Sequence, residues 1–280
     1  MSTSLRDVRD QRGEVVAVAQ LGGGMVEVSA RLPHLAGVAK PGQFAQLRCG
    51  GSTTPLLRRP FSVAWTEDDV ASFVLAPVGV GTRRLAALRP GEPLDALGPL
   101  GQGFTVSGAT RALCVSGGLG CAPFPLLIRA LRRAGTQTVT VVSGAASAAR
   151  LYPAARFARG DPGVHVEQVT EDGSRGRRGL VTDAVPAHLD GASTAVYACG
   201  PTPMMVALAR ILQGSPAPPI AQVSLEAPMG CGYGTCLGCA LPVRGADGQA
   251  WTLCCREGPV MDVETVDWDE LMTLPPAHVA

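Results

Sequence analysis

Short apolar runs separated by turn residues dominate the first hundred positions of the chain. The clearest runs are rich in Val, Phe and Leu and lie at 15–18, 25–28, 44–47 and 72–75. Glycine and proline turns separate them at 22–24, 41–42 and 90–91. Short strands at this spacing predict an antiparallel β-barrel or sandwich.

The pattern changes from about residue 110. An apolar run at 112–115 ends in a glycine turn, and residues 124–131 then carry apolar side chains at helical spacing. Two further strand-like runs follow at 138–142 and 194–198. Strands that alternate with helices indicate a parallel α/β sheet.

These patterns divide the chain into three predicted domains. A β-barrel covers residues 1–106, a parallel α/β domain covers 107–215, and a small C-terminal domain covers 216–280, after a proline-rich linker at 214–219. A chain of 280 residues has room for two or three domains. The hydrophobic fraction of 46% is enough to build their cores.

Composition and charge exclude several classes of partner. The net charge is +1 and aromatic residues make up 4%, which gives neither the basic footprint nor the stacking surface of a nucleic-acid-binding protein. No apolar run approaches the roughly 18 residues of a membrane span. Residues 1–12 mix Arg with Asp and lack the apolar core of a signal peptide. We therefore expect a cytoplasmic protein with no nucleic-acid or membrane partner.

Five of the nine cysteines fall close together near the C-terminus, at Cys231, Cys236, Cys239, Cys254 and Cys255. A disulfide framework is not expected in the cytoplasm. The first three follow the C-x4-C-x2-C spacing of plant-type [2Fe–2S] proteins. The surrounding glycines allow unusual backbone angles and let N–H groups approach the sulfurs. The segment is therefore predicted to hold a [2Fe–2S] cluster.

The residues leave the fourth ligand open between Cys254 and Cys255. Runs at 240–243 and 250–253 predict a hairpin that returns the chain to the cluster loop. Neighbouring strand residues point to opposite faces, so only one of the two cysteines can face the cluster. A structural zinc site or a set of buried thiols is the alternative. Zinc is less favoured because there is one C-x2-C pair and no His between 231 and 255.

Two motifs in the first domain indicate a flavin nucleotide. Arg59-Pro60-Phe61-Ser62 places a cation at a stiff proline turn, which suits a phosphate, and a hydroxyl two residues further on. Gly81 and Thr82 belong to a glycine turn that is predicted to open a helix, where exposed N–H groups suit a pyrophosphate.

Two turns in the second domain indicate a nucleotide-binding site. The alternative is that they are ordinary structural turns. Gly117, Gly118 and Gly120 follow a predicted strand and precede a helix, but Pro123 stands where the dinucleotide fingerprint has its third glycine. The run at 199–201, Cys199-Gly200-Pro201, ends another predicted strand. Ligands of parallel sheets bind at such carboxyl ends. The residues do not separate NAD from NADP.

Together these motifs closely resemble the electron-transfer subunits of NAD-dependent (class 1B) dihydroorotate dehydrogenases, within the ferredoxin–NADP reductase superfamily. The resemblance covers nearly the whole chain. The segments that carry it are 41–44, 59–62, 81–82, 97–104, 117–120, 170–174, 179–183, 197–201 and 224–231.

The resemblance implies an FAD-binding barrel, an NAD-binding α/β domain and a [2Fe–2S] domain. It assigns FAD contacts to Arg59, Pro60, Phe61, Ser62, Gly81 and Thr82, and cluster ligands to Cys231, Cys236 and Cys239. It favours Cys255 as the fourth ligand, because the family cysteine stands just before x-(Asp/Glu)-Gly-Pro, as in 255–259. Val74, Leu75 and Ala76 stand where the family's flavin strand carries a Tyr-Arg pair, which leaves open how the flavin is held there.

The function implied is electron transfer. A nicotinamide moves two electrons as hydride, the cluster moves one, and FAD does both, so no catalytic side chain is expected. The expected partner is an FMN-containing dihydroorotate dehydrogenase subunit of pyrimidine biosynthesis, in a heterotetramer of two plus two. Alternatives are a related subunit of an NAD(P)H:ferredoxin oxidoreductase or sulfhydrogenase and, from another class, a zinc-stabilised nucleotide-binding regulator.

Overall fold

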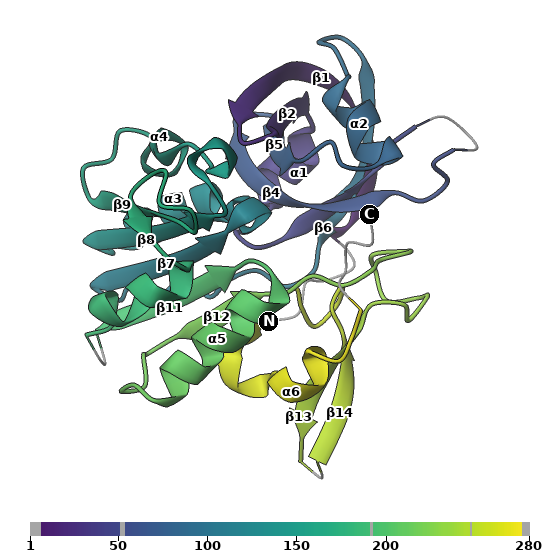
Figure 1. Cartoon of the computed structure of the whole chain (residues 1–280). Helices are drawn as coiled ribbons and strands as arrows, with labels where there is room; N and C mark the ends of the chain where they lie inside the picture. The colour runs from purple at the N-terminus through teal and green to yellow at the C-terminus, as the bar shows by residue number, and fades with distance from the viewer. Residues whose placement is uncertain (1–6, 51–53, 191–192, 247, 276–280) are drawn as a thin grey trace.

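The N-terminal part of the chain forms a closed six-stranded barrel, in the order β1-β2-β5-β4-β3-β6 (Figure 1). The computed structural model describes residues 7–50, 54–190, 193–246 and 248–275. The barrel strands are antiparallel: β1 (Arg9–Gly22), β2 (Met25–Arg31), β3 (Phe44–Leu47), β4 (Arg59–Glu67), β5 (Val70–Leu75) and β6 (Pro93–Leu100). The predicted antiparallel barrel is confirmed.

Alternation along the strands gives the barrel one face inside and one outside. On β3, Ala45 and Leu47 join the barrel core, whereas Phe44 packs with the C-terminal part of the chain. Short helices α1 (Pro33–Val38) and α2 (Val80–Ala86) lie in the connections. The outer face of β3, which carries Phe44, is covered by the segment that contains the cysteines.

A seven-stranded sheet follows, in the order β10-β9-β8-β7-β11-β12-β15. Its strands are β7 (Arg111–Gly117), β8 (Thr138–Ala145), β9 (Val164–Thr170), β10 (Arg177–Arg178), β11 (Thr194–Cys199), β12 (Ala221–Ser224) and β15 (Val260–Asp262). All neighbours are parallel except β15, which runs antiparallel to β12. The predicted parallel α/β sheet is confirmed.

Helices cover both faces of this sheet (Figure 1). On β7, Ala112 and Cys114 pack with α3 (Phe124–Arg133) and α4 (Ala154–Ala158), whereas Leu113 and Val115 pack with α5 (Thr202–Gln213). A strand buried on both faces is apolar at every position, which is why residues 112–115 show no alternation.

The C-terminal segment is tied to both other parts of the molecule. It supplies β12 and β15 to the seven-stranded sheet, so the sheet continues past the proline-rich stretch at 214–219. It also forms the predicted hairpin, β13 (Ala240–Gly245) and β14 (Gly248–Leu253), beside α6 (Trp268–Leu271). Gln102, just after the last barrel strand, donates its backbone N–H to the Gly258 carbonyl at 2.6 Å. The division of the chain at 106 and 215 stays a prediction.

The helices are short. Within the described ranges, none has both the length and the apolar character needed to cross a membrane.

Candidate functional site

Four cysteines of the C-terminal segment gather as two pairs. The sulfurs of Cys239 and Cys255 lie 3.2 Å apart, and the Cys255 backbone N–H points at the Cys239 sulfur at 3.5 Å. The Cys231 sulfur accepts hydrogen bonds from the N–H groups of Thr235 and Cys236, at 3.3 and 3.4 Å. Among the described residues, no three metal-binding side chains surround a single point. Two pairs of thiols match the ligand count of two irons, with two cysteines on each.

Hydrogen bonds favour the thiolate form, which binds iron, at Cys231 and Cys239. The hydrogen bond shared with Cys255 lowers the pKa of Cys239 to about 6. The same contact raises the pKa of Cys255, so this pair shares one proton. Burial raises the pKa of Cys231, but hydrogen bonds from its neighbours outweigh that effect and lower it to about 7. The donor set therefore fits a thiolate-bound cluster.

Cys254 and Cys255 point in different directions, as the sequence predicts for neighbours. Cys254 is fully buried, and its sulfur lies 3.5 Å from the Leu225 carbonyl oxygen, beside the end of β12. Burial raises the pKa of its thiol far above the usual range. Cys255 instead faces Cys239. This geometry favours Cys255 over Cys254 as the fourth ligand.

Two glycines bring the cysteine loop close to its neighbours. Gly232 has φ +85° and Gly234 has φ +92°, angles that other residues rarely adopt. A Cβ on Gly232 would lie 2.7 Å from Cγ of Gln46 in the barrel. A Cβ on Gly234 would lie 2.2 Å from Cδ of Arg256. The loop therefore packs directly on strand β3.

Gln46 is the residue at this contact, and the sequence analysis missed it. Its side chain is fully buried, yet neither its amide nitrogen nor its amide oxygen has a hydrogen-bond partner among the residues that the structure describes. It pairs across the sheet with Pro60 of the predicted flavin motif. A buried unpaired polar group costs about 1–3 kcal/mol. A polar group bound between β4 and the cysteine loop would satisfy this amide, so the residues present fit a cofactor here.

The flavin motif lies along the start of β4. Pro60 and Ser62 share a strand face, and Ser62 is paired with Phe44. Pro60, Phe61 and Ser62 are half-buried, whereas Arg59 is exposed and donates to the carbonyl oxygens of Leu57 and Arg58, at 3.0 and 3.2 Å. The sequence predicts that this motif leads into a strand, and in the structure the strand includes it.

The glycine turn before α2 closes on itself. The Gly79 N–H donates to the Thr82 hydroxyl at 2.9 Å, and that hydroxyl donates to the Gly79 carbonyl oxygen at 3.1 Å. Gly81 is buried, and a Cβ there would lie 3.0 Å from Cβ of Cys49. The Thr82 hydroxyl thus stabilises the turn through hydrogen bonds to the backbone of Gly79.

The end of β5 and the residue after it, 74–76, offer only aliphatic side chains. Leu75 belongs to the barrel core, whereas Val74 is buried against residues of the α/β part, including Phe124. Ala76 is half-buried. This stretch therefore supplies neither an aromatic ring nor a cation to a bound flavin.

The two predicted nucleotide turns meet at the carboxyl edge of the parallel sheet. Gly117 ends β7, Cys199 ends the neighbouring β11, and Gly200 and Pro201 lead into α5. A Cβ on Gly120 would lie 2.1 Å from the Cys199 carbonyl oxygen. Gly118 has φ +54°, and no atom in the described part of the chain lies within 4 Å of a Cβ built there. Contact between adjacent turns at this edge is the arrangement in which open α/β sheets bind ligands.

Comparisons with known proteins identify the family. The model of the iron-sulfur cluster binding domain of dihydroorotate dehydrogenase B matches residues 226–267, and that of the oxidoreductase NAD-binding domain matches 114–210. The dihydroorotate dehydrogenase B (NAD(+)) electron transfer subunit of Desulforamulus reducens is 36% identical over 241 residues, covering 85% of this chain and 90% of the relative. That of Bacillus caldolyticus is 38% identical, covering 79% and 84%. The chain belongs to this family of electron transfer subunits.

Solved structures agree with the family. The NADH-dependent reduced ferredoxin-NADP oxidoreductase structure superposes with a TM-score of 0.80 at 29% identity, over 93% of this chain and 91% of the other. A ferredoxin reductase of carbazole 1,9a-dioxygenase shares the fold, with a TM-score of 0.65 at 24% identity, over 75% and 67%. The predicted resemblance, the oxidoreductase class and the cofactors, an iron–sulfur cluster, FAD and NAD, are confirmed.

Proposed function

We propose that this subunit carries electrons between NAD(H) and a separate FMN-containing dihydroorotate dehydrogenase subunit. The observation that carries the proposal is the packing of the cysteine loop on strand β3, at Gln46, which pairs with Pro60 of β4. This packing supports the proposal, because we assign the cysteines to a one-electron carrier and the start of β4 to a flavin.

When bound, the nicotinamide exchanges a hydride, the cluster exchanges single electrons, and the flavin does both. The chain's own residues bind and orient these groups. We assign Cys231, Cys236, Cys239 and Cys255 to the irons, 59–62, 74–76 and 81–82 to FAD, and 117–120 and 199–201 to the nicotinamide nucleotide. We assign no side chain to proton transfer, since neither exchange requires one.

The electron-transfer subunits in this family imply a catalytic partner, and their name points to dihydroorotate as its substrate. A heterotetramer of two plus two, a role in pyrimidine biosynthesis and a cytoplasmic location are further parts of the proposal. They rest on the resemblance and on the sequence features given above.

The proposal is tested by reconstitution. The purified chain mixed with a dihydroorotate dehydrogenase subunit should reduce NAD+ when dihydroorotate is added, measured as absorbance of NADH, and neither protein alone should do so. NADP+ in place of NAD+ tests the choice of nucleotide. If reduced ferredoxin drives the reaction and dihydroorotate does not, the chain is instead a subunit of a ferredoxin oxidoreductase.

Gln46 gives a second test, because its unpaired amide should destabilise the cofactor-free chain and help to bind the cofactors. We expect Gln46→Leu to raise the melting temperature of the cofactor-free protein and to weaken FAD binding about tenfold, or roughly 1.4 kcal/mol. Thermal unfolding and flavin titration measure the two effects.

Gln43→Leu is the matched control for this substitution. Gln43 is also buried, but its side chain bonds the Gly101 carbonyl oxygen at 2.9 Å and the Lys40 N–H at 2.8 Å. Gln43→Leu should therefore lower the melting temperature. If Gln46→Leu lowers it equally and leaves FAD affinity unchanged, Gln46 is an ordinary structural residue.

A further inference from the structure

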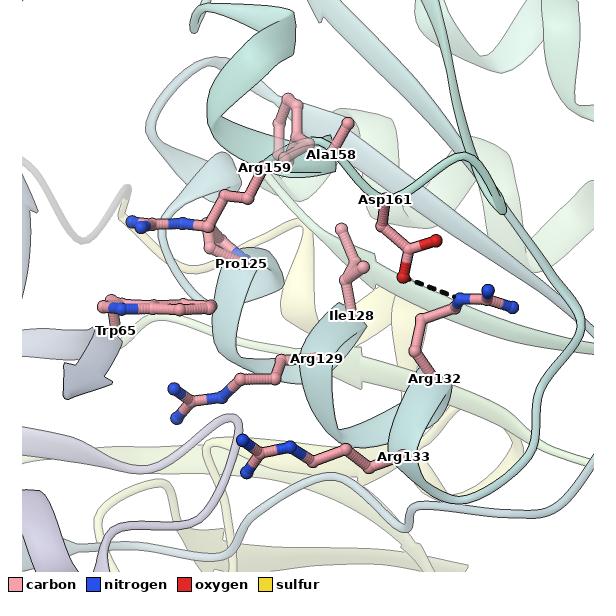
Figure 2. A pocket seen from close by; sticks show the side chains of 10 residues that line it. Trp65, Pro125, Ile128, Arg129, Arg132, Arg133, Ala158, Arg159 and Asp161 are labelled. Carbon is pink, nitrogen blue, oxygen red and sulfur yellow. Dashed lines mark hydrogen bonds and ion pairs between the residues drawn. The ribbon is translucent and has the colours of Figure 1, made fainter.

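A cavity of about 390 Å³ lies between the barrel and the α/β part, away from the residues assigned above. Trp65 of β4 forms one wall, and residues of α3, of the end of α4 and of the chain just after it form the others (Figure 2). Four of its lining residues are arginines: Arg129, Arg132, Arg133 and Arg159. We name this site the arginine pocket.

The arginine pocket carries excess positive charge. Among the described residues that line it, Asp161 is the single acidic one, and it pairs with Arg132 at 2.9 Å. Arg129, Arg133 and Arg159 have no ion pair with any residue that the structure describes. Burial lowers the pKa of Arg129, and the charges of Arg133 and Arg159 lower it further, although Glu67 acts in the opposite direction. Because these cations repel one another around the cavity, binding of an anion between them is favoured.

Trp65 holds two of these cations in position. The guanidinium carbon of Arg129 lies 4.1 Å from the ring centroid and that of Arg159 lies 3.8 Å from it. The ring is seen between them in Figure 2. Arg129 also donates to the Thr66 carbonyl oxygen at 2.5 Å and to the Thr66 hydroxyl at 2.7 Å. Cation–π contacts of this kind fix side chains that would otherwise be mobile.

The backbone at Arg159 is itself unusual. Arg159 has φ +45°, a left-handed conformation that costs a residue with a side chain roughly 1–2 kcal/mol. This conformation ends α4 and places the guanidinium over Trp65. Non-glycine residues held in such conformations cluster at binding sites.

The arginine pocket runs along α3, from Pro125 near the start of the helix to Arg132 and Arg133 near its end. Helix α3 begins at Phe124, just after the Gly117–Gly120 turn, and Arg132 and Arg133 lie in its last turn. Ten residues of helix span about 15 Å. Arg132 and Arg133 therefore lie far from the turns assigned to NAD, and no lining residue of the pocket belongs to those turns.

We propose that the arginine pocket binds a phosphorylated small molecule. Guanidinium groups pair with phosphate oxygens through two parallel hydrogen bonds, which makes arginine the preferred phosphate ligand. Pro125, Ile128 and Ala158 supply apolar walls for the rest of the molecule. Because the walls come from two parts of the chain, the bound ligand holds the barrel and the α/β part together.

The test uses pyrophosphate as probe and the FAD-loaded protein saturated with NAD+, so that the dinucleotide sites are filled. We expect saturable binding by calorimetry, with a change in tryptophan fluorescence that Trp65→Phe removes. Arg133→Gln and Arg159→Gln should each weaken binding at least tenfold. Arg89→Gln removes one exposed positive charge outside the pocket and should leave binding unchanged.

Three outcomes would overturn the proposal. Absence of saturable binding to the wild-type protein would do so, whatever the variants show. Equal weakening in Arg89→Gln and Arg133→Gln would show attraction to net charge rather than a site. If the wild-type protein does not bind pyrophosphate, and Arg133→Gln loses binding of the catalytic subunit, this surface is a protein interface. Visible spectra of bound flavin check that each variant is folded.

Discussion

Cys255→Ser will lower the iron and sulfide content of the purified protein at least tenfold, whereas Cys254→Ser will leave both unchanged. The Cys255 sulfur lies 3.2 Å from that of Cys239, while the Cys254 sulfur faces the Leu225 carbonyl oxygen at 3.5 Å. Serine keeps the shape of the side chain but not the thiolate that binds iron. Iron and sulfide analysis of anaerobically prepared protein, with the visible spectrum, measures the difference.

The two variants should also separate the functions of the cofactors. Bound FAD should remain in Cys255→Ser, because the proposed flavin strand β4 does not contain this residue. Dihydroorotate-dependent reduction of NAD+ should then be lost, while reduction of ferricyanide by NADH, which requires only flavin, should persist. A protein that loses its cluster on Cys254→Ser and keeps it on Cys255→Ser would reverse the assignment.

The cysteine spacing carries most of the information about the cluster loop, because its ligands are close in sequence. The choice between Cys254 and Cys255 depends instead on how the chain turns after β14. That strand ends at Leu253, and both cysteines lie in the turn that follows. Strand alternation predicts that they diverge but not which one faces Cys239. The contact of Cys254 with Leu225 settles their orientation, and it joins residues far apart in the sequence.

The parallel sheet is predictable where its strands are long and apolar, as at β7, β8 and β11. Strands β12 and β15 have four and three residues, and the sequence gives no sign that they pair. Their pairing brings the start of the C-terminal segment onto the sheet. Which strands pair depends on the tertiary fold. The local sequence pattern therefore shows that these residues follow the linker, but it does not show that they continue the sheet.

Polar residues that become buried are the hardest to predict. Gln46 alternates with Ala45 and Leu47, so its strand pattern predicts an exposed side chain. The cysteine loop covers this face of β3, and only the fold brings Gly232 to it. The arginine pocket is hidden for the same reason, since Trp65, Arg129 and Arg159 come from separate segments.

Gly120→Ala will weaken NAD binding at least tenfold, the second large effect that we expect. A Cβ at this position would lie 2.1 Å from the Cys199 carbonyl oxygen and 2.7 Å from the Gly200 nitrogen. Both are backbone atoms, so one of the two turns must move. Forcing atoms into a packed site costs about 1–3 kcal/mol. Calorimetric titration of the FAD-loaded protein with NAD+, and thermal unfolding, measure the two consequences.

Gly118→Asn is the matched control, because Gly118 lies two residues away in the same turn. It has φ +54°, no atom of the described residues lies within 4 Å of a Cβ built there, and asparagine tolerates left-handed backbone. The turn should therefore keep its place against β11, and NAD affinity should change much less than in Gly120→Ala. Equal affinities in the wild type and Gly120→Ala would show that contact between the two turns does not shape the nucleotide site. Equal losses of NAD affinity in the two variants would show that the conformation of the glycine turn matters and its contact with the second turn does not. The two variants therefore separate these two explanations.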